Sequence, residues 1–192
     1  MQPDWEQFKA HTKEQITLYL KSAENKPQAR HLLMDLFDKD PESEYDVSAT
    51  LHLIHSTPNK RDAAVVGMMA YLWMYEVDYV RCLDAFCYLL ISNGHDLFHS
   101  LRNKYVKSLD DIGRVDVYTK LNFLEEHSFG LLKRPEDMAL RNKIAHHAFV
   151  IDHSGKVFIA KKEVEVGEKF NNLVGFQHQV FLAYCSGLGI DV

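Results

Sequence analysis

Apolar residues recur at the spacing of a helix through most of the chain. In the first segment Trp5, Phe8 and Ile16 fall on one face of a helix that ends before Pro27. The same spacing, interrupted by proline, glycine and asparagine, predicts helices over residues 5–23, 28–37, 47–55, 61–91, 95–106, 112–127, 135 to 146 or 147, and 168–188. The pattern therefore predicts a mostly helical protein.

The longest predicted helix, residues 61–91, contains no proline and is apolar on most of its sides. A helix of this kind is buried all round, so we expect it at the centre of a bundle. The Tyr, Trp and Met residues between Met68 and Tyr79 lie at helical spacing. We expect them in the core or in a dimer interface rather than in a base-stacking platform.

The period changes after residue 147. Residues 149–151 and 156–159 are short apolar runs on either side of a Ser-Gly turn, which predicts a β-hairpin. The predicted fold is all-α: a helical bundle with a small C-terminal β-hairpin between the last two helices. We expect residues 1–192 to form one domain, with an N-terminal helical extension (1–60) packed on a core (61–192).

Composition and charge narrow the class of protein. Apolar residues make up 46% of the chain and charged residues 26%, which is typical of a globular protein. The net charge of −5 argues against a protein that coats nucleic acid with positive charge. Residues 128–162, however, carry seven Lys and Arg against three Asp and Glu, a net +4, which leaves −9 for the remainder. This basic segment suits a phosphate ligand, and it is also typical of a solvated face.

Three cysteines, Cys82, Cys87 and Cys185, lie in apolar runs, and their number is odd. We expect reduced core residues in a cytoplasmic protein. The N-terminal residues are polar, so we expect no signal peptide. The longest apolar run, residues 63–75, is too short to span a bilayer, and we expect no membrane association.

Side chains that can bind phosphate and transfer protons are concentrated in the string Leu-Arg-Asn-Lys-Ile-Ala-His at residues 140–146. An arginine followed by a histidine after four to six residues is expected roughly once by chance in a chain of this composition, but Arg-Asn-x-x-Ala-His is much rarer. A second Leu-Arg-Asn-Lys string, at residues 101–104, has no histidine at that spacing. The helix at residues 135–147 would begin with a proline and two carboxylates, which favour a helix start.

On such a helix Asn142 and His146 lie one turn apart and nearly aligned, whereas Arg141 lies about 140° around the axis from His146. A complete site therefore needs a cleft that both edges of the helix line, such as one formed against a second copy. Attack of an RNA 2′-hydroxyl on the adjacent phosphorus would use all three groups. Arginine grips phosphate oxygens, histidine transfers protons near neutral pH, and asparagine orients the imidazole or donates to phosphate. A histidine near a helix C-terminus is favoured in its protonated form, as a general acid requires.

Arg141, Asn142 and His146 are thus the expected catalytic residues, and the reaction needs neither metal nor cofactor. His147 is an auxiliary candidate because it also satisfies the spacing. We favour His146 because it aligns with Asn142. The expected substrate-binding cations are Lys143 and Arg134, from the basic segment.

Glu76 interrupts the most apolar helix. It is expected to orient Arg141 as an auxiliary residue, to pair with Arg81, or to meet solvent. Two histidine pairs have metal-compatible spacing without a third ligand, so we expect packing or surface positions and no metal site: His95 with His99, and His52 with His55.

The string at residues 140–146, late in a helical chain, resembles the motif of the HEPN superfamily: an arginine, a polar neighbour, and a histidine after four to six residues. The resemblance covers about residues 61–188, and its specific part is 140–146. It implies a helical bundle that dimerises so that two motifs share a cleft. It commonly implies a metal-independent endoribonuclease that forms a 2′,3′-cyclic phosphate, in toxin–antitoxin or other defence systems, with RNA as substrate and an antitoxin or regulatory protein as partner.

One departure from the family matters. Members paired with nucleotidyltransferase antitoxins carry a tyrosine two residues after the histidine, where this chain has Ala148. Control by modification of that tyrosine is therefore not expected. Two alternatives remain: a non-catalytic HEPN module that dimerises or binds nucleotides, and an unrelated helical protein-interaction domain.

Overall fold

The computed structural model describes residues 4–22, 26–36, 47–99, 102–134 and 137–190. Their contacts group the chain into two units, described separately below. Unit 1 comprises residues 1–38, 80–134 and 177–192, and unit 2 comprises residues 39–79 and 135–176. The expected single domain, with residues 1–60 packed on a 61–192 core, stays a prediction.

Unit 1 is built on α5 (Val80–Ser92), which α1 (Trp5–Ser22) and α7 (Val117–Glu126) contact. The ring of Phe86 on α5 is fully buried at its centre. Ring centroids of Phe8, Phe129 and Tyr184 lie 5.6, 4.8 and 5.7 Å from that of Phe86. The other elements of the unit are α2 (Lys26–Asp35), β1 (Phe98–His99), β2 (Lys104–Tyr105), α6 (Leu109–Ile112), a 3-10 turn (Gly130–Lys133) and the end of α9 (Val166–Leu188).

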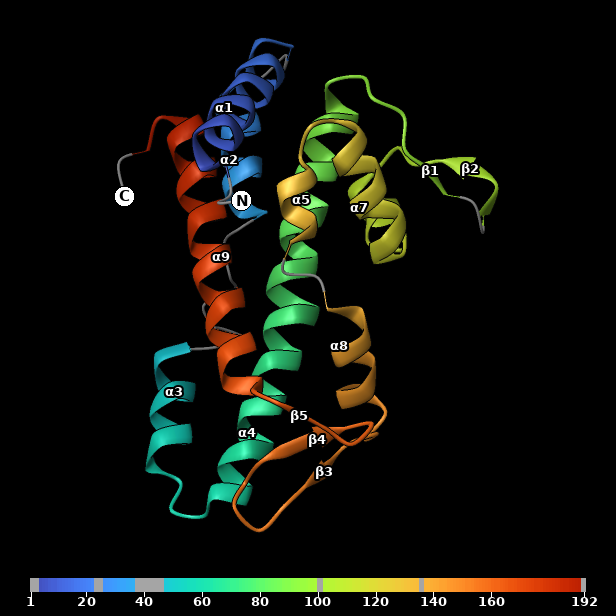
Figure 1. The fold of residues 1–192 in the computed structure, drawn as a ribbon. Helices are drawn as coiled ribbons and strands as arrows, with labels where there is room; N and C mark the ends of the chain where they lie inside the picture. Colours follow the sequence, from blue (N-terminus) through green and yellow to red (C-terminus); the bar gives the residue numbers. More distant parts are fainter. Residues whose placement is uncertain (1–3, 23–25, 37–46, 100–101, 135–136, 191–192) are drawn as a thin grey trace. The chain divides into compact units, whose positions relative to one another are not determined.

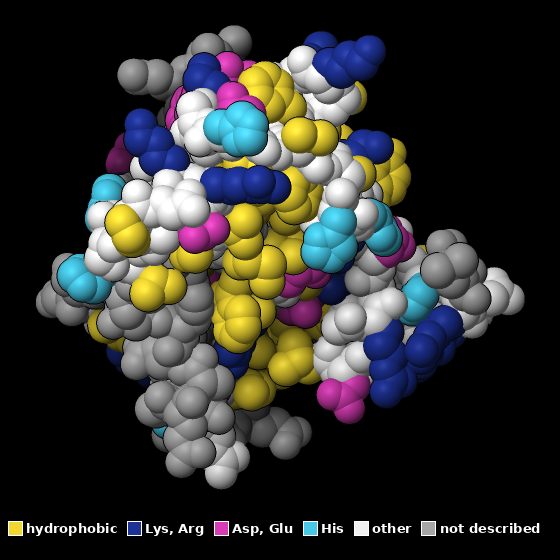
Figure 2. Space-filling view, turned by 90° about the horizontal axis from the view of Figure 1, so that it is seen from below, with side chains coloured by type: hydrophobic (Ala, Val, Ile, Leu, Met, Phe, Trp, Pro, Cys, Tyr) yellow, Lys and Arg dark blue, Asp and Glu magenta, His cyan; other side chains and the backbone are white. Residues whose placement is uncertain are grey.

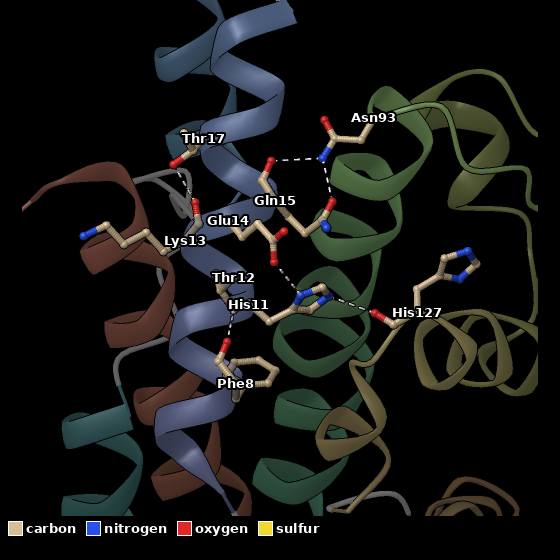
Figure 3. Close-up of polar contacts among 9 residues, drawn as sticks. All are labelled: Phe8, His11, Thr12, Lys13, Glu14, Gln15, Thr17, Asn93 and His127. Atoms are coloured by element: carbon tan, nitrogen blue, oxygen red, sulfur yellow. Dashed lines mark hydrogen bonds and ion pairs between the residues drawn. The ribbon is translucent and has the colours of Figure 1, made fainter.

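Polar side chains join α1 to the ends of α5 and α7 (Figure 3). Asn93 donates to the backbone oxygen and to the side-chain oxygen of Gln15, at 2.9 and 2.8 Å. Nε2 of His11 donates to the carbonyl oxygen of His127 at 3.0 Å, and its Nδ1 lies 3.4 Å from Glu14. The bond from His11 satisfies a carbonyl oxygen at the C-terminus of α7, which the helix itself leaves open.

In sequence order, unit 2 contains helices α3 and α4, then helix α8 and a small sheet (Figure 1). Helix α8 runs beside α4. In the sheet, Val150 pairs with Phe158, and Val157 pairs with Val164, so the order is β3-β4-β5, all antiparallel. The elements are α3 (Val47–Ser56), α4 (Lys60–Trp73), a π-helical turn (Met74–Tyr79), α8 (Met138–Ala145), β3 (Val150–Ile151), β4 (Val157–Ile159), β5 (Lys162–Val164) and the start of α9.

The described residues confirm a mostly helical protein. The helix predicted for residues 61–91 is present as α4, the π-helical turn and α5. The tyrosines Tyr71, Tyr75 and Tyr79 of its apolar cluster are 2%, 1% and 0% exposed, as expected for core residues. The hairpin predicted after residue 147 is present as β3 and β4, and β5 extends it by a third strand.

The helix predicted for residues 95–106 is wrong, because this segment forms the β1–β2 hairpin. Burial alternates along it: Leu97 and His99 are 2% and 3% exposed, whereas Phe98 between them is 42% exposed. Phe98 lies opposite Tyr105, with ring centroids 5.3 Å apart. A period of two is that of a strand, and a cross-strand aromatic pair stabilises the hairpin.

All three cysteines are buried free thiols, as expected. Burial raises the pKa of the Cys82 and Cys87 thiols far above the ordinary range, so neither is a nucleophile near neutral pH. Among the residues that the structure describes, no helix combines the length and the apolar character that crossing a membrane requires.

Candidate functional site

The motif lies on α8, a short helix with a defined start. Asp137 is its N-cap, and its Oδ1 accepts from the backbone N–H of Leu140 at 3.1 Å, which satisfies one open donor of the first turn. Its Oδ2 accepts from Lys169 at 3.0 Å. The predicted start at Pro135 and Glu136 lies outside the described residues. Sequence reasoning placed Asp137 inside the first turn, whereas the structure places it just before the helix, as the cap.

Burial divides α8 into two faces. Leu140 and Ile144, one turn apart, are 5% and 3% exposed and fix the helix in unit 2. Arg141 and Asn142 are half-buried, and His146 is exposed. The apolar pair therefore holds the motif in place while its polar groups stay accessible.

Arg141 is held by two neighbours within unit 2. Its Nε donates to Oε1 of Glu76, and its Nη1 donates to Oδ1 of Asn142 at 2.7 Å. The hydrogen bond with Glu76 is the main cause that raises the pKa of Arg141; desolvation opposes it, and the charge of Glu76 adds to it. The guanidinium is thus permanently charged, with its orientation set by an acceptor on each side.

Glu76 lies in the π-helical turn Met74–Tyr79 that follows α4. A π-helical turn contains one more residue than an α-helical turn, so it shifts the side chains that follow it around the axis; such turns recur at functional sites. Arg81, the other partner considered for Glu76, instead donates to the backbone oxygens of Leu36 and Asp35, at 3.1 and 3.2 Å. The structure therefore selects Arg141 as the partner of Glu76.

Asn142 has a partner that neither of its two expected roles includes. Its carboxamide oxygen is used by Arg141, and among the described residues no hydrogen bond joins Asn142 to His146. The expectation that Asn142 orients His146 rested on their alignment along one helix face. In the structure that oxygen accepts from the adjacent guanidinium, because Arg141 is charged and half-buried and needs acceptors.

The C-terminus of α8 separates the two candidate histidines. His146 is the C-cap with φ −96°, whereas His147 has φ +53°, in the left-handed region. The backbone N–H of His147 donates to the oxygen of Ile144 at 3.0 Å, and that of Ala148 donates to the oxygen of Lys143 at 2.8 Å. This pair of bonds is a Schellman motif, in which glycine usually occupies the left-handed position. The backbone therefore reverses at His147, and His146 is the last residue that continues the helix.

His147→Gly is expected to raise the free energy of unfolding by about 0.5–1 kcal/mol, because glycine adopts the left-handed conformation without strain. Urea denaturation followed by circular dichroism measures the change. His146→Gly is the matched control: its φ is negative, so the added chain freedom of glycine should lower stability. A His147→Gly protein that is no more stable than the parent would mean that the imidazole contributes contacts outweighing the strain.

The remaining predicted residues are dispersed. Lys143 is exposed on α8, whereas Arg134 belongs to unit 1, so its place relative to the motif is not described. His95 packs on His127, with ring centroids 4.4 Å apart, and His99 is buried. In the described part of the chain, no three histidine, cysteine or acidic side chains converge to hold a metal ion.

A groove of 590 Å³ begins where α8 ends. Sequence reasoning missed it, because it is lined by the residues of the sheet and not by the motif. Its lining includes His147, Phe149, Val150, Phe158, Ala160 and Lys161. The signal that could have found it was the pair of phenylalanines, one in each of the two predicted strands.

The chain matches no family model, no curated protein and no solved structure.

Proposed function

We propose that the chain is a metal-independent endoribonuclease of HEPN type, with a HEPN-like helical bundle as its fold. The observation that supports it most is the anchored guanidinium of Arg141, which donates to Glu76 and to Asn142. Arg141 lies on α8, the short helix whose C-cap is His146. An arginine with two acceptors fixed behind it presents its remaining N–H groups in a defined direction, as recognition of a phosphodiester requires.

The roles follow from the geometry of α8. Arg141 binds the phosphate oxygens and stabilises the charge that develops as the 2′-oxygen attacks the phosphorus. His146, exposed at the helix C-terminus, transfers protons to and from the 2′- and 5′-oxygens. Asn142 and Glu76 act as positioning residues for Arg141. The bond to the 5′-oxygen breaks as the 2′-oxygen bonds to phosphorus, which gives a 2′,3′-cyclic phosphate and a 5′-hydroxyl.

A direct test uses a labelled single-stranded RNA in buffer with excess EDTA. The expected result is cleavage into fragments that end in a 2′,3′-cyclic phosphate, identified by mass spectrometry. RNA binding without cleavage would favour the non-catalytic HEPN module. The absence of both would remove the proposal and leave the helical interaction domain.

A second copy of the chain is the proposed partner at the site. An apolar ridge at four-residue spacing follows α4 into the π-helical turn that carries Glu76: Val65, Met69, Trp73 and Val77 are 43%, 59%, 44% and 39% exposed. Apolar side chains are visible at the surface beside Lys, Arg and His side chains (Figure 2). Burial of such a ridge within an interface of about 1,200–2,000 Å² would suit a stable dimer.

Met69→Asp is therefore expected to convert a dimer into a monomer, because it places a carboxylate in the middle of the ridge. Size-exclusion chromatography with light scattering measures the mass in solution. The control is Tyr118→Asp, at an apolar side chain of unit 1 that is 60% exposed, and it should leave the dimer intact. A wild-type protein that is monomeric at micromolar concentration, or a Met69→Asp protein that stays dimeric, would contradict the proposed interface.

We further propose a cytoplasmic protein, because its three buried thiols require no oxidising compartment, and an antitoxin or other regulatory protein as a second partner.

A further inference from the structure

The groove at the end of α8 has the size and walls of a ligand site. Its volume of 590 Å³ lies in the range of small-molecule pockets. Phe149 and Phe158 are both half-buried, so each ring is supported by the protein and still accessible. The ring of His147 lies 6.2 Å from that of Phe149. Planar groups of this kind are what an unstacked nucleobase packs against.

The charge of the groove suits a phosphate. Lys161 is exposed at its edge, and the described lining contains no carboxylate. The position of this lysine is set by the two-residue turn between β4 and β5, in which Ala160 and Lys161 both have positive φ, 49° and 67°. An aromatic wall with a cation beside it is the combination that single-stranded nucleic-acid sites use.

Backbone strain is concentrated at the same place. Five described residues other than glycine have positive φ, and three of them, His147, Ala160 and Lys161, line this groove. Glycine would adopt these conformations at lower cost, so the chain keeps side chains where the backbone disfavours them. The Schellman motif and the β4–β5 turn therefore place three side-chain-bearing residues around one groove.

We propose that this groove binds one unpaired nucleobase and its phosphate in a single-stranded RNA, next to the linkage that His146 acts on. The proposal rests on the proposed ribonuclease function, and it adds a binding site for one base and one phosphate of the substrate. His147 follows His146 directly in the chain, so the groove begins one residue from the proposed proton-transfer group. A duplex hides both faces of its bases in the stack, so the groove selects single strands.

The experiment measures the affinity of an unstructured, fluorescein-labelled RNA decamer by anisotropy, with His146→Ala in every protein to prevent cleavage. Phe149→Leu and Phe158→Leu keep the apolar character and remove the ring. Each is expected to weaken binding about 5- to 100-fold. Phe158→Tyr keeps a ring and should keep the affinity. Lys161→Gly removes one cation, so the slope of log affinity against log salt should become shallower by about 0.7.

Matched controls are Phe98→Leu, which removes a partly exposed ring in unit 1, and Lys162→Ala, which removes the lysine next to Lys161. Neither should change the affinity for the decamer by more than about twofold, and circular dichroism confirms that each variant is folded. Unchanged affinity in both Phe→Leu variants, or equal affinity of the parent for the decamer and its duplex, would overturn the proposal.

Cleavage by the groove variants in the active, His146-containing protein separates this inference from the proposed function. Groove variants should raise KM and leave kcat within about threefold. RNA cleavage that is insensitive to all groove variants would refute the groove and keep the ribonuclease. Groove-dependent RNA binding by a protein that never cleaves RNA would keep the groove as a binding site and refute the ribonuclease.

Discussion

Arg141→Ala and His146→Ala are each expected to lower kcat for metal-free RNA cleavage by about 10²–10⁴-fold. Removal of His146 takes away a proton-transfer group, and removal of Arg141 takes away the positive charge that Glu76 and Asn142 hold in place at the motif. Single-turnover cleavage of a labelled RNA in EDTA gives the rate of the chemical step. Neither substitution removes a buried apolar side chain, so the fold should be retained.

The chain contains matched controls for both substitutions. Arg102→Ala alters the second Leu-Arg-Asn-Lys string, which has no histidine after it, and should leave the rate unchanged. His147→Ala identifies the acting histidine, because the backbone reverses between the two rings. If His147→Ala and not His146→Ala abolishes cleavage, the assigned roles are exchanged. A rate unaffected by Arg141→Ala would remove the motif from the mechanism.

Glu76→Gln tests positioning rather than chemistry. Glutamine keeps an acceptor for the guanidinium and loses the charge, so kcat should fall less than in Glu76→Ala, where Arg141 loses that anchor altogether. A merely structural role would reduce stability equally in both variants and leave the kcat of the folded protein unchanged. Thermal unfolding of both proteins, measured beside the kinetics, distinguishes these outcomes.

Long helices were predictable from the sequence, because apolar residues at helical spacing fall on one face that can pack on the core. Phe8 and Ile16 of the first run are 3% and 0% exposed, and α9 ends at Leu188 as predicted. The hairpin turns, where the chain reverses direction, were less predictable. The turns at Asn103 and at Ala160–Lys161 use positive φ without glycine, so no Asn-Gly or Ser-Gly signal marks them.

In the candidate site, the sequence could place residues on their helices but could not assign their side-chain partners. A carboxylate in an apolar helix needs a cation, so Glu76 could be linked to Arg141 or to Arg81, but the π-helical turn that decides between them has no sequence signal. Asn142 could be placed on α8 but not paired, because a side chain at a helix surface can reach several neighbours. The groove was missed because its walls come together only when β3 and β4 pair after the reversal of the backbone at His147.

The burial pattern of helix α7 likewise depends on a partner that the sequence does not reveal. Tyr118 lies at helical spacing with the apolar residues of this segment, yet it is 60% exposed, whereas Lys120 is 1% exposed. Nζ of Lys120 lies 2.6 Å from Oδ1 of Asp84 on α5, whose side chain is 19% exposed. Periodicity assigns a lysine to the surface, and only a carboxylate on the facing helix makes its burial tolerable. The pair is therefore a tertiary feature that one helix alone could not predict.

Lys120→Met is expected to lower the free energy of unfolding by about 3–5 kcal/mol near neutral pH, because it leaves the Asp84 carboxylate buried without its counter-charge. Burial already raises the pKa of Asp84, and Lys120 opposes that rise. A carboxyl whose pKa is raised on folding favours the folded state below its unfolded pKa of about 3.9 and loses that contribution as pH rises. The loss in Lys120→Met should therefore shrink toward pH 4, as Asp84 becomes neutral. Urea denaturation at several pH values measures it.

The double variant Asp84→Asn with Lys120→Met separates loss of the pair from loss of packing. With neither charge buried, it should recover most of the stability lost by Lys120→Met, because the isolated carboxylate causes the larger part of the cost. Lys9→Met is the surface control: Lys9 pairs with Glu6 at 3.2 Å, and the Glu6 side chain is 87% exposed, so the change should stay below about 1 kcal/mol. A double variant as unstable as Lys120→Met would show that the aliphatic stem of Lys120, and not its charge, holds α7 on α5.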